Sequence, residues 1–146
     1  MNMDYGKNGM LLTESFEKCR LTPYRDGGGV WTNGWGNTRH VDPKITITQD
    51  QADSDLMANV QDAADCVNDL VSVTLTQNQF DSLVDFVFNV GGGAFKSSTL
   101  LRRLNAGDIA GASAQFKLWN KIKGVASKGL DNRRFAETAL FEKVQT

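Results

Sequence analysis

Two carboxylic acids and a hydroxyl follow one another near the start of the chain, at Glu17, Asp26 and Thr32. Hydrolysis of a glycosidic bond needs an acid to protonate the leaving oxygen and a second carboxylate to activate water or attack the anomeric carbon. Glu17, beside apolar side chains, would stay protonated because burial disfavours the charged form. Asp26 on a polar turn would stay ionised, and the Thr32 hydroxyl would hold the attacking water. The spacing suggests a glycosidase site, but it is not specific, because each acid could equally be a surface charge.

Two neighbouring side chains offer other chemistry. Glu14 lies three residues before Glu17, on nearly the same face of a helix. Its position after Thr13, a candidate N-cap, is explained by the favourable field at a helix start. Cys19 could act as a nucleophile with His40 as its base, but no helix N-terminus activates its thiol. A core-facing thiol is the simpler interpretation of that cysteine.

The local sequence predicts a helix, a turn and a strand to carry the three candidates. We expect residues 1–10 to form a flexible arm and a short helix to start at Thr13. Pro23 should end that helix because its ring disfavours helical geometry in the residue before it. Residues 27–29 are glycines and form a turn, and residues 30–32 are strand formers in a small sheet or irregular hairpin. The glutamate would then lie on the helix, the aspartate at the mouth of the turn and the threonine on the return strand.

Hydrophobic periodicity predicts a helical remainder. One long helix should run over about 49–70, with Thr48 as its N-cap. Thr76 caps a second, strongly apolar helix that ends at about Val90, where the glycines 91–93 stop it. Further elements are expected as a helix at about 98–105 stopped by Gly107, a helix at about 108–119 capped by Asp108, a basic loop at 121–129 and a helix at about 131–142.

These elements predict an α+β fold with a lysozyme-like plan of two lobes. We expect one domain over residues 1–146. Its small N-terminal lobe, about 11–48, would carry the short β-sheet, and a connecting helix, 49–70, would lead to a mostly helical lobe, 71–146. The cleft between two such lobes is a natural place for a ligand.

The composition is typical of a soluble globular protein, with 40% hydrophobic and 23% charged residues. We find neither an apolar run of transmembrane length nor an N-terminal signal pattern, and therefore expect no stable membrane insertion and a cytoplasmic location. Two cysteines do not form a disulfide framework, and a single histidine without a Cys-x-x-Cys motif argues against zinc. We expect no metal and no cofactor.

Charge is distributed unevenly along the chain. Residues 1–95 hold 6 basic and 13 acidic side chains, a net charge of −7, whereas residues 96–146 hold 10 basic and 4 acidic, a net charge of +6. A basic C-terminal half favours an anionic polymer such as a nucleic acid, a teichoic acid or lipopolysaccharide surface, or a peptide-bearing cell-wall glycan. A solvated basic face is the alternative. No nucleic-acid-binding motif is present, so we expect no nucleic-acid partner.

A longer pattern surrounds the three candidates and resembles a known family. The pattern reads Tyr24-x-Asp26-x-x-Gly29-x-x-Thr32-x-Gly34-x-Gly36-x-Thr38, with Glu17 before it. It resembles the phage-type lysozymes, the endolysins of tailed bacteriophages. Later blocks match the family in the same order, at 75–91, 98–107 and 129–141. Blocks in one order over most of residues 11–142 are far more specific than any single block.

The resemblance implies muramidase activity, the hydrolysis of the β-1,4 bond between N-acetylmuramic acid and N-acetylglucosamine in peptidoglycan, and hence lysis of the host cell. It makes Glu17 the general acid and gives Thr32 the task of positioning the water. Asp26 would assist that water or stabilise the cationic sugar. Inversion of configuration is expected from the family, but sequence spacing does not give the distance between the two carboxylates.

The resemblance also implies residues that bind substrate and support the acid. Phe88 would offer an aromatic face to the sugar, and Asn89 an amide to its polar groups. Arg133 matches an arginine that pairs with the acid, and Arg134 is an alternative for that role. Such a cation favours the ionised glutamate and so opposes the effect of burial.

One position departs from the family pattern. The family usually has histidine where this chain has Asn37, and His40, three positions later, does not align without an insertion. Asparagine keeps a neutral hydrogen bond but carries no charge. If the histidine orients loops, Asn37 would support the acid equally well; if it pairs with a carboxylate, local stability should be weaker. His40 itself is expected on a surface loop.

Two other functions compete with a lytic muramidase. A non-catalytic glycan-binding module could keep the cleft and lack activity through Asn37, although the intact Glu17, Asp26 and Thr32 argue against it. A lytic transglycosylase or chitinase would use one dominant acid and would tolerate Asp26→Asn. For a phage-type lysozyme we expect a monomer that stays in the host cytoplasm until a separate holin releases it to the cell wall.

Overall fold

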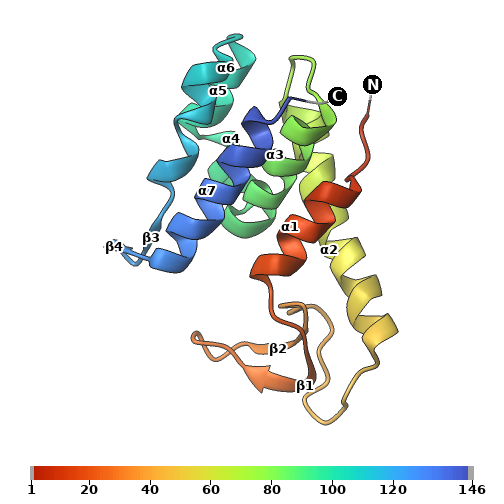
Figure 1. Cartoon of the computed structure of the whole chain (residues 1–146). Helices are drawn as coiled ribbons and strands as arrows, with labels where there is room; N and C mark the ends of the chain where they lie inside the picture. The colour runs from red at the N-terminus through yellow and green to blue at the C-terminus, as the bar shows by residue number, and fades with distance from the viewer. Residues whose placement is uncertain (1, 145–146) are drawn as a thin grey trace.

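The structure is a computed structural model that describes residues 2–144. Figure 1 shows a helix-rich chain with a small β-hairpin at one end. The described helices are α1 Lys7–Phe16, α2 Gln49–Leu70, α3 Gln77–Val90, α4 Gly92–Lys96, α5 Thr99–Asn105, α6 Ile109–Ser113, the 3₁₀ turn η1 Phe116–Leu118 and α7 Lys128–Glu142. The strands are β1 Arg20–Arg25, β2 Trp31–Gly34, β3 Lys121–Ile122 and β4 Val125–Ala126. The predicted α+β class is confirmed.

The two strand pairs are separate antiparallel hairpins. In the first, Tyr24 lies opposite Thr32, and the register is irregular between Arg20 and Tyr24. Figure 1 places this β1–β2 hairpin beyond the end of α1, and the long helix α2 leads from it into the helical part of the molecule. The second hairpin, β3–β4, precedes α7.

Helix α3 lies at the centre of the helical part and packs against α1, α2 and α7. The side chain of Phe86 on α3 is fully buried and makes edge-to-face contacts with Phe95, Phe116 and Trp119. The strongly apolar helix that the sequence predicts at this position is therefore the core of the protein.

Helices α2 and α3 begin where their capping residues predict. The Thr48 hydroxyl accepts a hydrogen bond from the backbone N–H of Gln51 at 3.1 Å. Thr76 and Gln79 form a complete capping box, in which each side chain accepts the other's backbone N–H. Such boxes satisfy donors that a helix start leaves free, which explains why these boundaries follow from sequence.

Helix α1 differs from the expectation. It starts at Lys7, so Thr13 is not its N-cap and residues 7–10 are not part of a flexible arm. Asp81 on α3 supplies the cap instead, because its carboxylate accepts the backbone N–H groups of Gly6 at 2.9 Å and Gly9 at 3.2 Å. A cap from a distant helix leaves no local signal in the sequence.

Helix α1 also ends earlier than expected. Glu17 is the C-cap residue, with extended backbone angles, and the chain continues into β1. Pro23 lies within β1 and does not end the helix. A two-stranded sheet has only edge strands, where a proline without an N–H group is tolerated.

Four boundaries in the second half also differ. Gly91, at φ 95°, ends α3, but residues 92–93 belong to α4. The helix expected at 108–119 is divided into α6 and η1, although Asp108 caps it as predicted. The basic loop contains the β3–β4 hairpin, and Ser127, before Asp131, caps the last helix.

Two negative findings apply to the residues that the structure describes. None of their helices is long and apolar enough to cross a membrane. Within the same residues, no three His, Cys, Asp or Glu side chains are grouped as a metal site would require.

A matched pair of Phe→Ala changes tests the position of the core. Phe86→Ala should lower the free energy of unfolding by about 3–5 kcal/mol, because it removes a fully buried ring. Phe135→Ala, at a side chain that is 77% exposed, should change it by less than about 0.5 kcal/mol. Urea unfolding measures both values. Equal losses in the two variants would contradict the central place of α3.

Candidate active site

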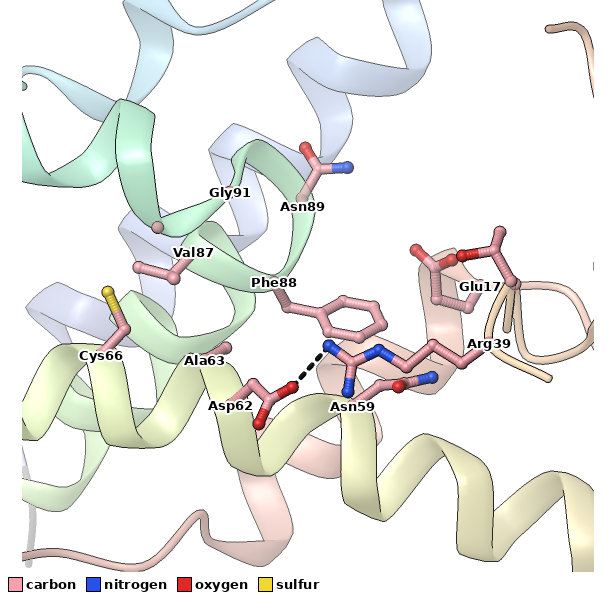
Figure 2. A pocket seen from close by; sticks show the side chains of 13 residues that line it. Glu17, Arg39, Asn59, Asp62, Ala63, Cys66, Val87, Phe88, Asn89 and Gly91 are labelled. Carbon is pink, nitrogen blue, oxygen red and sulfur yellow. Dashed lines mark ion pairs between the residues drawn. The ribbon is translucent and has the colours of Figure 1, made fainter. Parts of the chain in front are cut away.

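An open cleft of about 560 Å³ lies between the loop that follows β2, helix α2 and the end of α3. Figure 2 shows Glu17 on one side of this cleft, and Phe88 and Asn89 on another. The lining residues are Glu17, Gly36, Thr38, Arg39, Asn59, Asp62, Ala63, Cys66, Val87, Phe88, Asn89, Gly91 and Gly92. The structure therefore brings three of the predicted site residues to one cleft.

Arg39 and Asp62 face each other within this cleft (Figure 2). The Arg39 Nη2 atom lies 2.5 Å from Asp62 Oδ2, and both side chains are more than half exposed. An ion pair so accessible to water adds little stability. The pair is therefore a solvent-exposed contact within the cleft.

Glu17 pairs with Arg133, as the resemblance implied. Its side chain is 22% exposed, and Arg133 Nη1 donates a hydrogen bond to Glu17 Oε2 at 2.5 Å. Arg134 is not the partner of the acid, because its Nη2 group donates to Asn89 Oδ1. The end of α1 and the buried face of α7 together position this pair.

Arg133 is also bound to a residue that the sequence interpretation missed, Asp85 on α3. Arg133 Nη2 donates to Asp85 Oδ1 at 2.8 Å, and Nε donates to Oδ2 at 3.1 Å. Burial alone would lower the pKa of Arg133, but the hydrogen bonds and charge of Asp85, followed by those of Glu17, raise it above its usual value. The sequence did contain a sign of this contact: Asp85 lies in a strongly apolar helix, and a buried carboxylate needs a partner.

Asp26 and Thr32 lie on the β1–β2 hairpin and are not among the residues that line the cleft. Asp26 is exposed, and its Oδ1 atom accepts the backbone N–H groups of Gly28 and Val30, both at 2.9 Å. Thr32 is buried, and its hydroxyl donates to the Val30 carbonyl at 3.0 Å. The Thr32 oxygen keeps lone pairs with which to accept a hydrogen bond from water.

Asn37 is buried at the centre of an amide network rather than against the acid. Its Nδ2 group donates to Asn33 Oδ1 and to the Arg39 carbonyl, both at 3.0 Å. Asn59 on α2 donates to Asn37 Oδ1 at 3.0 Å. These bonds tie the loop after β2 to α2 without any charge. Of the two roles considered for the side chain at position 37, orienting loops or pairing with a carboxylate, these hydrogen bonds favour the first.

Gly36, in the same loop, forms the wall beside the acid. A Cβ atom added there would lie 3.1 Å from Glu17 Oε1, and the backbone has φ 74°. Both features disfavour a larger residue, and glycine lets the backbone itself approach the carboxyl group. His40, in the same segment, is exposed as predicted.

The two alternative nucleophile and acid candidates do not enter the cleft. Glu14 is exposed in the last turn of α1, so the explanation that placed it at a helix start is wrong. Cys19 is partly exposed and lies 3.5 Å from Gln49 Nε2, so it is not the core-facing thiol that was expected.

Residues 14–137 match the sequence profile of the family described as Phage lysozyme. The chain belongs to the phage lysozyme family. An endolysin of Acyrthosiphon pisum secondary endosymbiont phage 1 is 41% identical to this lysozyme over 144 residues, which cover 96% of this chain and 99% of the relative.

Solved structures agree with this assignment. The endolysin from Escherichia coli O157:H7 phage FAHEc1 superposes with a TM-score of 0.89 at 34% identity, covering 97% of this chain and 95% of that one. The muramidase domain of SpmX from Asticaccaulis excentricus gives a TM-score of 0.92 at 33% identity, with coverages of 98% and 100%. The predicted lysozyme-like fold is confirmed, and the lysozyme is a glycoside hydrolase, a muramidase endolysin that lyses peptidoglycan.

The approach of Gly36 to the acid can be tested with an alanine. Gly36→Ala in this lysozyme should reduce lytic activity at least about tenfold, because the new methyl group displaces the Glu17 carboxyl. The left-handed backbone should add about 1–2 kcal/mol of destabilisation. Gly93→Ala is the matched control, since nothing lies within 4 Å of its Cβ position. Turbidity of a cell-wall suspension and urea unfolding measure the two effects; full activity in Gly36→Ala would contradict the geometry.

The neutral amide network makes a second prediction. Asn59→Ala should cost about 1–2 kcal/mol of unfolding free energy, because it removes a donor from the buried Asn37. The loss should be the same at pH 5 and pH 8, since neither amide titrates. Gln61→Ala, an exposed amide on the same helix, is the control and should cost less than about 0.5 kcal/mol. A loss that varies with pH would show that a charged group takes part.

Proposed function

We propose that Glu17 is the general acid with which this lysozyme cleaves the β-1,4 bond between N-acetylmuramic acid and N-acetylglucosamine. The pairing of Glu17, which lines the cleft, with the buried Arg133 is the observation that carries the proposal. Arg133 binds Oε2, while Oε1 faces Gly36 in the cleft wall. The acid is thus held at one oxygen and presents the other to the leaving group.

Asp26 and Thr32 complete the proposed reaction from the β1–β2 hairpin. Asp26 is exposed, and its Oδ1 atom accepts two backbone N–H groups that fix the carboxylate on the turn. It activates the water or stabilises the positive charge that develops on the sugar. Thr32 accepts a hydrogen bond from that water. This division of labour between two carboxyl groups agrees with inversion of configuration.

Phe88 and Asn89 are proposed to bind the glycan. Figure 2 shows the Phe88 ring projecting into the cleft, where an aromatic face packs against a sugar ring. Arg134 occupies Asn89 Oδ1, which leaves the amide N–H groups of Asn89 to donate to the substrate.

We propose further that residues 1–146 act as a single domain and as a monomer. The small lobe of about 11–48 and the helical lobe of 71–146, joined by residues 49–70, would close on the glycan strand between them. The resemblance to phage endolysins supports accumulation in the host cytoplasm until a separate holin admits the enzyme to the wall. The net charge of +6 on residues 96–146 supports attraction to an anionic cell wall.

Digestion of purified peptidoglycan tests the catalytic assignment. Glu17→Gln should lower the rate about 10²–10⁴-fold, because the amide cannot donate a catalytic proton, and Asp26→Asn should also lose activity. Glu14→Gln is the matched control, three residues earlier and exposed, and should retain the wild-type rate. Mass analysis should find new reducing ends in the wild-type digest. Anhydro ends, together with an active Asp26→Asn, would instead identify a lytic transglycosylase, and an active Glu17→Gln would refute the assigned acid.

A further inference from the structure

Each of the three guanidinium nitrogen atoms of Arg133 donates a hydrogen bond to a carboxyl oxygen. Nη1 donates to Glu17 at 2.5 Å, whereas Nη2 and Nε donate to the two oxygens of Asp85 at 2.8 and 3.1 Å. We propose that Asp85 is a positioning residue: it fixes the guanidinium plane of Arg133 and offsets the charge that this cation presents to Glu17. The inference rests on the role of Glu17 proposed above.

Asp85 is itself held from a second direction. It is fully buried, and the Thr13 hydroxyl on α1 donates to its Oδ1 atom at 2.7 Å. The Tyr5 hydroxyl lies 2.7 Å from that of Thr13. Burial and the charge of Asp85 raise the pKa of Tyr5, so its hydroxyl keeps its proton. Asp85 therefore has a single orientation, and the two parallel bonds transmit that orientation to Arg133.

A proton on Glu137 lets Asp85 stay ionised beside a second buried carboxyl group. If Glu137 were ionised, neither of its carboxylate oxygens would accept a hydrogen bond of good geometry. Burial, followed by its hydrogen bond with Asp85 and the charge of Asp85, raises the pKa of Glu137 well above its usual value. Burial alone would also raise the pKa of Asp85, but hydrogen bonds from Glu137, Arg133 and Thr13 hold it below its usual value. We therefore place the proton on Glu137, which donates a hydrogen bond to the Asp85 carboxylate.

The charge on Asp85 decides how strongly Arg133 acts on the acid. An unpaired guanidinium beside Glu17 would favour the ionised form, which cannot protonate a leaving group. With Asp85 ionised, the cation is shared between two carboxyl groups. Further charged or titratable groups near this pair are Glu137, whose Oε2 lies 3.9 Å from Arg133 Nε, Arg134 on α7, and Asp81 one turn earlier on α3. Arg134 Nε lies 3.2 Å from Glu137 Oε1, and Asp81 is bound to the start of α1.

The pH profile of lytic activity separates this role from a merely structural one. Activity that depends on a protonated acid falls as pH rises. In Asp85→Asn no carboxylate offsets the charge of Arg133. The fall of activity on the alkaline side of the pH profile, the alkaline limb, should therefore move to lower pH by about one unit. Glu137→Gln is the matched control in the same buried cluster, because it replaces a neutral acid by a neutral amide. Its alkaline limb should coincide with that of the wild type.

The double variant Asp85→Asn/Glu137→Gln prevents Glu137 from ionising in place of Asp85. Its limb should move at least as far as that of Asp85→Asn. Activity lost equally at every pH with an unmoved limb, or a shift in Glu137→Gln equal to that in Asp85→Asn, would overturn the proposal. If Glu17→Gln is inactive and the pH profile of Asp85→Asn matches that of the wild type, the role of Asp85 is refuted and that of Glu17 stands. If Glu17→Gln is active, the proposed role of Glu17 as the acid is itself refuted.

Carboxyl ¹³C NMR of the wild-type protein tests the same cluster without Asp85→Asn, which could fail to fold. The resonance that disappears in Glu137→Gln should remain that of a protonated acid through neutral pH. The Asp85 resonance should remain that of a carboxylate below the usual range of an aspartate. An ionised Glu137, or a protonated Asp85, at neutral pH would overturn the charge assignment.

Discussion

A buried cation, Arg133, joins Glu17, the proposed acid, to the core of this lysozyme. Its side chain is only 5% exposed, and a charge removed from water to that extent destabilises a protein unless anions and hydrogen bonds surround it. Glu17, directly after α1, and Asp85 on α3 provide these partners. The guanidinium therefore requires the end of α1, α3 and α7 to meet at one point.

The same requirement explains the unusual polarity of the core. Asp81, Asp85, Arg133, Arg134 and Glu137 are all buried within or beside the apolar cluster around α3. Asp81 and Asp85 each accept several donors, and burial raises the pKa of Glu137. Such a cluster adds little net stability compared with apolar packing, but removal of one member leaves another charge unpaired. It ties the orientation of the acid to the folding of the protein as a whole.

Much of the fold and part of the site could be predicted from sequence. The starts of helices α2 and α3 depend on caps whose partners lie within one helical turn. Thr48 and Thr76 therefore indicate these starts from the local sequence alone. Helix α1 was misplaced because Asp81, far along the chain, supplies its cap. In the site, family motifs indicated Glu17, Phe88, Asn89 and Arg133, which the structure brings together or pairs. Asp85 and Asn59 were missed because their importance arises from contacts between helices, which no local pattern records.

Glu17 and Arg133 lie 116 positions apart in the chain. A growing polypeptide that has emerged through α3 already carries the glutamate, Asp85 and the residues of the cleft floor, but the arginine is still to be made. Domains generally acquire their structure as units when synthesis supplies the missing part. Because Arg133 lies on the last helix, the Glu17–Arg133 ion pair can form only after α7 has been synthesised.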